Sequence, residues 1–379
     1  MSYFLNSSGV QTGPFTLEQF RALQAEGRIP AEALYWCEGM AEWHPFAMFS
    51  EVVQATASDL STRSFAGFWR RLAAFVVDMI FLGVIGFLLG TVFFDFFSRL
   101  GTYGPIVGLV LAGLYFGLLD SKNFGGQTLG KRLLKIVVLG NTGLLISIPR
   151  SFGRFAVWGV PYFLWAPLSG SDPLATSSMV VAPIFFIWLA VITYLFVFNR
   201  PTRQTLPDLV ANTYVANLSQ SGSFPPTVFW KPHVIILVAL SALALGLFGT
   251  GYFLVGTFLK SSFAELIAIQ RALISQPDIQ SASVVAGQNV TWINGKTRSS
   301  TNLVVNAQWN GKPKNMGDAA RTVAGVVLDK GLEEATKQEN LVITISYGYN
   351  IGLASGQLRQ NYPHTVTQWQ DIVRDSSAP

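Results

Sequence analysis

Long apolar runs alternate with short polar connections through the middle of this 379-residue chain. Four of them, 72–97, 105–119, 179–198 and 233–259, have lengths near the roughly 20 residues that a helix needs to cross a bilayer. A fifth run, 155–168, is shorter and contains two prolines, so crossing, re-entry and an interfacial position all stay open for it. The pattern predicts an α-helical transmembrane bundle of four to five spans.

Before the apolar block, residues 1–53 have the pattern of a small α+β domain. Thr16 has the side chain of a helix N-cap. Apolar residues follow it at helical spacing: Leu17, Phe20 and Leu23. Gly27 is expected to end this helix, and the run 34–36 predicts a strand after it.

After the last apolar run, apolar and polar residues alternate again. Period-two alternation over 303–309 and 341–349 predicts two half-buried strands. Between them, 320–328 carries one apolar helical face, and an earlier helix over 261–275 is expected to continue out of the last span. These elements predict a soluble α+β domain over 260–379.

The predicted fold class is a multidomain membrane protein. A small α+β N-terminal domain precedes an α-helical transmembrane bundle, and an α+β soluble domain follows it. The expected boundaries are 1–53, a linker 54–63, the membrane domain 64–217, a linker 218–232, an additional span 233–259, and the C-terminal domain 260–379.

Composition supports membrane residence and removes several other classes. Charged residues make up 12% of the chain, against about 25% in typical soluble domains. The net charge of +5 comes from Lys and Arg spread along the chain, so no basic patch for nucleic acid is expected. The single cysteine, Cys37, excludes an internal disulfide, and no Cys/His motif predicts a metal or cofactor. Without a nucleophile, a metal motif or a paired acid and base, we expect no enzymatic activity.

The distribution of basic residues predicts the orientation of the spans. Lys and Arg are frequent before the first span, between 119 and 155, and after 198, whereas 169–178 has none. We therefore expect the N-terminus in the cytoplasm and the C-terminal domain in the periplasm or exterior. This solution requires 155–168 to cross, and the inverted alternative would place the basic cluster from Arg200 to Lys231 outside.

Two segments of the N-terminal domain carry recognisable motifs: Gly13-Pro14-Phe15 and Trp36-Cys37-Glu38-Gly39-Met40-Ala41-Glu42-Trp43. They resemble the bacterial GYF-like domain, a relative of the eukaryotic domain that binds proline-rich peptides. Where the eukaryotic pattern has Met, Trp and Gly-Tyr-Phe, this chain has Phe20, Leu23 and Gly27-Arg28-Ile29. The resemblance implies a cytoplasmic protein or proline-rich peptide as partner. An aromatic groove for it would use Tyr3, Phe15, Trp36 and Trp43, unless these aromatics form the core instead.

Three ordered motifs lie in the membrane domain: Phe68-Trp69-Arg70-Arg71-Leu72-Ala73-Ala74-Phe75-Val76-Val77-Asp78, Gly126-Gln127-Thr128-Leu129-Gly130-Lys131-Arg132-Leu133-Leu134 and Arg203-Gln204-Thr205-Leu206-Pro207-Asp208. Over about 64–216 they resemble the RDD family of bacterial membrane proteins, which implies a multi-pass protein of the inner membrane. The family is named for one Arg and two Asp, which map to Arg71, Asp78 and Asp208. Pro207 replaces a common His and Asn212 a usual Gly, so any proton handling by that His is missing here.

Asp78 lies inside the first span, where an ionisable residue is costly and indicates function or a specific partner. Arg71 precedes it on roughly the same helix face. A rise of about 1.5 Å per residue separates their backbones by roughly 10 Å, and helical side chains lean toward the N-terminus. We therefore expect Arg71 and Asp78 not to pair. The candidate partners of Asp78 are Lys131, Arg132 and Arg203.

Other charged and small residues of the membrane domain have structural interpretations. Asp95 and Asp120 lie at span ends, where we expect them to be solvated. Residues 131–137 combine basic and apolar side chains, as in an interfacial stretch that contacts anionic lipid. Glycines at i and i+4 predict close helix packing, and their pairs are Gly86 with Gly90, Gly104 with Gly108, and Gly113 with Gly117.

Two functions are compatible with this organisation. In the first, the RDD-like bundle moves or gates a small solute or ion, as RDD-like proteins are suspected of doing, with Asp78 as the cation or proton site. Four or five spans are few for one transporting subunit, so this function implies a homo-oligomer. In the alternative, the chain is a membrane-anchored adaptor or scaffold that recruits a cytoplasmic partner through the GYF-like domain and contacts the envelope through its C-terminal domain.

Overall fold

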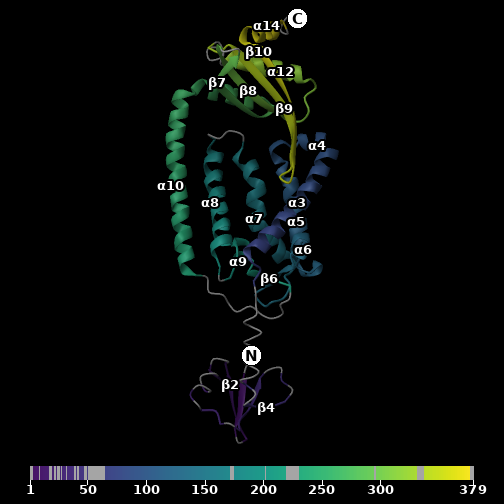
Figure 1. Ribbon diagram of the computed structural model, residues 1–379, viewed down its shortest axis with the longest axis vertical. Helices are drawn as coiled ribbons and strands as arrows, with labels where there is room; N and C mark the ends of the chain where they lie inside the picture. Colours follow the sequence, from purple (N-terminus) through teal and green to yellow (C-terminus); the bar gives the residue numbers. More distant parts are fainter. Residues whose placement is uncertain are drawn as a thin grey trace. The chain divides into compact units, whose positions relative to one another are not determined.

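The computed structural model describes most of residues 3–49, and 65–170, 175–200, 202–218, 230–293, 296–330 and 337–375. The predicted linker 54–63 lies outside the described residues, as do most of 218–232 and, in the first predicted helix, Leu17 and Gly27. The chain divides into two compact units, with the boundary between Ser64 and Phe65. The predicted multidomain layout is confirmed: a small strand-rich domain, a set of apolar helices and a C-terminal sheet domain (Figure 1).

The N-terminal unit is a four-stranded antiparallel sheet in the order β2-β1-β3-β4. Its strands are β1 (Tyr3–Ser7), β2 (Val10–Phe15), β3 (Leu34–Cys37) and β4 (His44–Pro45). Phe20, Tyr35 and Phe49 form its buried centre. Thr16 caps the helical turn after β2, because its hydroxyl accepts from the N–H of Gln19 while the Gln19 amide accepts from the N–H of Thr16. The predicted cap and the predicted strand are both confirmed.

The described membrane domain is built on α3 (Phe68–Val92), α5 (Pro105–Leu119), α7 (Ile148–Ser169), α8 (Thr176–Phe198) and α10 (Lys231–Ser262). Four described helical stretches are long and apolar enough to cross a membrane: 68–92, 101–119, 177–198 and 231–254. The run 72–97 was expected to be one span, but α3 ends at Val92 and a short helix, α4 (Phe94–Ser98), follows it.

The fifth helix, α7, runs between the same two ends of the bundle as its neighbours. Near its start, Arg154 contacts Asp120 at the end of α5. At its other end, the carbonyl of Ser169 accepts hydrogen bonds from Ser177 and Ser178 at the start of α8. The helix therefore runs the length of the bundle, although it is not among the four stretches apolar enough to cross a membrane, and the predicted orientation stays a prediction.

A proline inside α7 frees a backbone carbonyl that accepts a hydrogen bond from α8. Pro161 has no N–H, so the carbonyl of Val157 lacks the helical donor four residues later. The indole N–H of Trp188 in α8 donates to that carbonyl at 2.9 Å. Further along, Trp165 of α7 stacks on Phe185 of α8 with ring centroids 4.9 Å apart.

Next to the start of α3, a two-stranded antiparallel sheet joins distant parts of the membrane domain. It pairs β5 (Ile136–Gly140) with β6 (Thr213–Asn217), and the short helices α6 (Leu129–Leu133) and α9 (Leu206–Val210) precede these strands. The expectation of an interfacial amphipathic stretch over 131–137 is wrong for its buried residues, whereas Arg132, Leu133 and Lys135 are exposed and their contact with lipid stays a prediction. Lys131 is 9% exposed, and Ile136 and Val137 are buried in β5, because the sheet pairs their backbone and packs their side chains.

The C-terminal domain is a four-stranded sheet in the order β10-β9-β8-β7, with α11 (Ala264–Ile274), α12 (Met316–Lys330) and α14 (Val366–Asp375) packed on it. Its strands are β7 (Ile279–Ile293), β8 (Lys296–Trp309), β9 (Asn340–Asn350) and β10 (Ser355–Thr365). The central pair, β8 and β9, is parallel because α12 crosses between them. The predicted strands and the predicted 320–328 helix are confirmed as β8, β9 and α12, whereas β7, β10 and α14 were not foreseen. The helix expected to continue out of the last span is interrupted, since α10 ends at Ser262 and α11 begins at Ala264.

Candidate functional site

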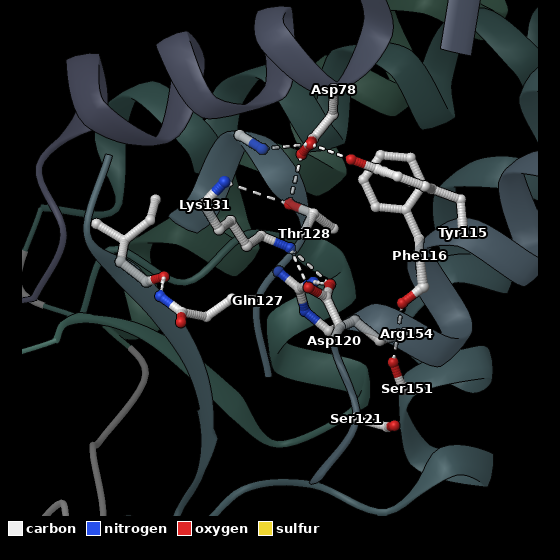
Figure 2. A network of polar contacts seen from close by, with 12 residues as sticks. Asp78, Tyr115, Phe116, Asp120, Ser121, Gln127, Thr128, Lys131, Ser151 and Arg154 are labelled. Atoms are coloured by element: carbon white, nitrogen blue, oxygen red, sulfur yellow. Dashed lines mark hydrogen bonds and ion pairs between the residues drawn. The ribbon is translucent and has the colours of Figure 1, made fainter. Parts of the chain in front are cut away.

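Asp78 is buried in α3, and the groups that donate hydrogen bonds to its carboxylate are neutral (Figure 2). The hydroxyls of Tyr115 and Thr128 donate at 2.7 and 2.6 Å, and the backbone N–H of Gly130 donates at 2.7 Å. Gly130 makes this approach possible, because a Cβ there would overlap the carbonyl of Ala74. The helix α6 can therefore lie directly against α3 and offer its backbone to the carboxylate.

The basic residues proposed as partners of Asp78 bind elsewhere, which corrects that expectation. Lys131 contacts Asp120, and the guanidinium of Arg132 donates to the carbonyl of Phe124 at 3.0 Å. Arg203 contributes its backbone carbonyl as an acceptor for Arg71. The close backbone contact at Gly130 and the two hydroxyls already supply the donors that Asp78 requires.

Asp120 was expected to be solvated at the end of its span, and this is wrong. It is 2% exposed and lies between two cations. The Nζ of Lys131 is 2.5 and 2.6 Å from its two oxygens, and the guanidinium of Arg154 donates to it at 2.8 Å. Burial lowers the pKa of Lys131, and the adjacent Asp120 carboxylate opposes that shift. By contrast, Asp95 is exposed, as expected.

Asp208 is fully buried in the first turn of α9 and is held by two arginines. Its oxygens lie 2.5 Å from Nη2 of Arg71 and 2.8 Å from Nη2 of Arg154. The backbone and hydroxyl of Thr205 donate to the same carboxylate at 3.0 and 2.9 Å. Burial opposes ionisation, but the charges of Arg154 and Arg71 outweigh it and hold the pKa of Asp208 well below its usual range.

Arg154 therefore connects two carboxylates, and the cluster closes into one network at the end of the bundle where α3 begins. We call it the charge network: Arg71, Asp78, Asp120, Lys131, Arg154 and Asp208. Thr128 joins Asp78 to the rest, because its hydroxyl donates to Asp78 and also accepts from the N–H of Lys131. Three cations and three carboxylates balance in formal charge, as burial of so many ionic groups requires.

The three residues mapped from the RDD motif thus meet in one region, although they do not form a single contact. Arg71 and Asp208 pair directly, and Arg71 does not pair with Asp78, as the helix geometry predicted. Sequence reasoning did not single out Arg154, Tyr115 or Thr128 as partners of these carboxylates. The available signal was a lone Arg at the start of an apolar run and an Asp at the end of another.

The two departures from the motif have local explanations. Asn212 has a φ of +50°, in the left-handed region that favours glycine and that Asn tolerates better than most residues. Pro207 lies in the first turn of α9, where a missing N–H breaks no helical bond. Both substitutions therefore preserve the backbone that presents Asp208.

The turn between β9 and β10 is seated against the membrane helices. Residues 349–354 lie against four glycines, two in α3 and two at the start of α5, which we call the glycine seat: Gly86, Gly90, Gly104 and Gly108. A Cβ at Gly90 would overlap the ring of Tyr349, and one at Gly108 would overlap the carbonyl of Ile351. Ile351 is fully buried there, and Figure 1 shows the hairpin reaching from the C-terminal sheet to α3 and α5.

The glycine pairs were expected to mediate helix packing, and this is correct for Gly113 with Gly117 and in part for Gly108, which also faces the ring of Phe163 in α7. Gly113 and Gly117 face Phe155 and Phe152 of α7. All four glycines of the seat accommodate the β9–β10 hairpin, because a hairpin backbone requires the same close approach that a second helix would use.

The aromatic residues proposed for peptide binding divide into two groups. Tyr3 and Phe15 pack on Phe20, with centroid distances of 5.4 and 6.3 Å, so they belong to the core. Trp36 and Trp43 are half-buried, and the indole N–H of Trp36 donates to the carbonyl of Met40 at 2.8 Å. A peptide groove would therefore rest on Trp36 and Trp43, and peptide binding stays a prediction.

Within the described ranges, no three His, Cys, Asp or Glu side chains come together as ligands for a metal ion.

Comparisons with curated proteins and with solved structures find no match. Two family models do match: residues 65–212 match the RDD family, and residues 3–51 match GYF domain 2. The RDD match contains every residue of the charge network, and the match to GYF domain 2 covers the N-terminal sheet. The chain therefore carries an RDD family membrane domain preceded by a GYF-like domain, as the sequence motifs predicted.

Proposed function

We propose that this protein is a membrane-anchored adaptor. The GYF-like domain would recruit a cytoplasmic partner, and the RDD domain would hold the C-terminal α+β domain in a fixed position to contact a component of the bacterial envelope. The seated hairpin carries this proposal. A domain tethered only through α10 would be free to rotate, whereas the turn at 351–354 fixes the C-terminal domain on α3 and α5.

Further contacts support a rigid attachment. Phe94 of α4 packs edge-on against Tyr347 and Tyr349 of β9, with centroids 5.8 and 5.5 Å away. The backbone N–H of Gly311 donates to the carbonyl of Ser98 at 3.1 Å. The charge network stabilises the other end of the helix bundle. Together with it, these contacts allow the RDD domain to support the C-terminal domain in one position.

Recruitment by the GYF-like domain is tested by measuring peptide binding to the intact protein in nanodiscs. A proline-rich peptide should bind the full chain, and binding should be lost when residues 1–53 are removed. Trp43→Ala should weaken it, whereas Tyr103→Ala, an exposed aromatic of the membrane domain, should leave it unchanged. Peptide binding that survives removal of 1–53, or no binding by the full chain, would contradict recruitment of proline-rich segments.

A second function, proton or cation transport, has one observation in its favour. Asp78 is a buried acid within the first span, and it contacts two hydroxyls that could pass a proton, those of Tyr115 and Thr128. If the protein transports protons or cations, vesicles carrying the Asp78→Asn variant should show a lower ion flux than vesicles carrying the wild type. Flux that is absent in both proteins, or equal in both, would favour the adaptor.

A further inference from the structure

A cavity of about 1010 Å³ lies where α7 ends, α8 begins and α10 passes beside them, under the first residues of β7. Its volume reaches the top of the range of roughly 300–1,000 Å³ that is typical of small-molecule sites. It is separate from the charge network, which lies at the other end of α7. Its walls are mostly apolar and include Trp165, Met179, Pro183, Leu245, Leu247 and Phe248.

Aromatic contacts build this cavity. Trp165 of α7 stacks on Phe185 of α8, and the neighbouring Phe186 stacks on Phe248 of α10 at 5.3 Å. These two contacts hold the three helices together at the cavity wall. Along α10, Gly249 and Gly251 line the space, and a Cβ at either would meet no atom within 4 Å. The missing side chains leave open space beside α10.

One end of the cavity is polar and carries no charge. Ser169 and Ser178 line it, with the Ser178 hydroxyl 2.6 Å from the Ser169 carbonyl, and Gln280 and Ser281 of β7 add further uncharged polar side chains. Pro183 has no N–H for the carbonyl of Met179, which leaves that carbonyl at the wall without its helical donor. Among the residues that the structure describes along the cavity, none is Asp, Glu, Lys, Arg or His.

We propose that this cavity binds a bilayer phospholipid with a zwitterionic head group, one acyl chain lying between α8 and α10. Two of its walls, α8 and α10, are apolar enough to cross the membrane, so acyl chains rather than water surround their flanks. The uncharged rim suits the ester and glycerol oxygens of a lipid and a head group without net charge. An anionic head group would find no cation among the lining residues that the structure describes.

The test uses the full-length protein in nanodiscs that contain a phosphatidylcholine with a photoreactive acyl chain. Peptides of α8 around Met179 and of α10 around Phe248 should be labelled several-fold more than the lipid-facing surface of α3. Ala182→Trp, which fills the cavity, should reduce this labelling several-fold. The matched variant Val180→Trp places the same side chain on an exposed position of α8 outside the cavity, and it should retain wild-type labelling.

Leu247→Trp fills the cavity from α10 and keeps the test valid if Ala182→Trp does not fold. Uniform labelling of all membrane helices, or labelling insensitive to both cavity variants, would overturn the proposal. Competition by unlabelled phosphatidylcholine should exceed that by phosphatidylglycerol. Stronger competition by phosphatidylglycerol would refute the zwitterionic head group.

Discussion

Arg71 and Asp208 are separated by 137 positions in the chain, yet Nη2 of the arginine lies 2.5 Å from Oδ2 of the aspartate and both side chains are buried. This pair holds the start of α3 against α9, the short helix that precedes β6. Arg154 binds the other oxygen of Asp208 and extends the attachment to α7. The RDD motif therefore marks an electrostatic clamp between segments that are far apart in sequence.

Removing one partner of this clamp should strongly destabilise the protein. Arg71→Met leaves the buried Asp208 with one cation fewer, a change that costs about 3–5 kcal/mol in comparable buried pairs. The double variant Arg71→Met/Asp208→Asn should recover part of that loss, because no uncompensated carboxylate remains. Thermal unfolding in nanodiscs measures both. Arg321→Ala, which removes an exposed ion pair, should change stability by less than about 0.5 kcal/mol, and an equally mild effect of Arg71→Met would contradict the clamp.

Stability should also fall in acid because of Asp208. Its pKa is depressed in the folded protein, whereas in the unfolded chain it returns to about 3.9. A depressed pKa contributes stability that is complete above the unfolded value and is lost as the pH falls toward the folded value. The Tm of the wild type should therefore decline below about pH 4. The decline should be shallower in Asp208→Asn and unchanged in the exposed-site control Asp318→Asn; equal slopes in all three would contradict this assignment.

Local patterns were sufficient for much of the fold. The helical spacing over 320–328 and the alternation over 341–349 predicted α12 and β9, since each element is amphipathic and packs on one core. The helix rise and the lean of helical side chains toward the N-terminus predicted that Arg71 and Asp78 do not pair. Periodicity was informative here because these elements expose one face and bury the other.

Other features depended on contacts that no local pattern records. The burial of Asp120 follows from Arg154 and Lys131, whose side chains reach it only when α6 and α7 pack around α5. The seat for the hairpin was visible in the sequence only as spaced glycines, and the same spacing also accommodates a helix. Glycine spacing indicates that something approaches closely, but it does not identify the approaching segment.

Asp78 should tolerate an amide better than an apolar side chain. In Asp78→Asn the oxygen can still accept from Tyr115 and Gly130, and the Thr128 hydroxyl can turn to accept from the new NH₂ group. In Asp78→Leu those donors lose their acceptor, at about 1–3 kcal/mol for each buried unsatisfied group. Thermal unfolding should rank wild type above Asp78→Asn and Asp78→Asn well above Asp78→Leu. Equal stability of the two variants would show that these hydrogen bonds contribute little.

The seat for the hairpin should be sensitive to a single methyl group. Gly108→Ala places a Cβ against the carbonyl of Ile351 and should displace the turn, at a cost of about 1–3 kcal/mol for overpacking. Gly249→Ala is the matched control, because a Cβ there meets nothing within 4 Å. Hydrogen exchange of residues 349–356 should accelerate in Gly108→Ala alone. Unchanged exchange in Gly108→Ala would mean that the turn is not held by the seat.

The bond between Trp188 and Val157 should matter only because Pro161 interrupts α7. Trp188→Phe removes the indole donor and leaves the Val157 carbonyl unpaired, which should cost about 1 kcal/mol or more. In a Pro161→Ala background the backbone N–H at position 161 can bond the same carbonyl, so Trp188→Phe should then cost less. Thermal unfolding of the four proteins gives the coupling energy directly. Trp69→Phe, at a side chain 76% exposed, should be neutral in both backgrounds. If Trp188→Phe costs the same with and without Pro161, its indole stabilises the helix pair by packing and not by replacing the donor that proline removes.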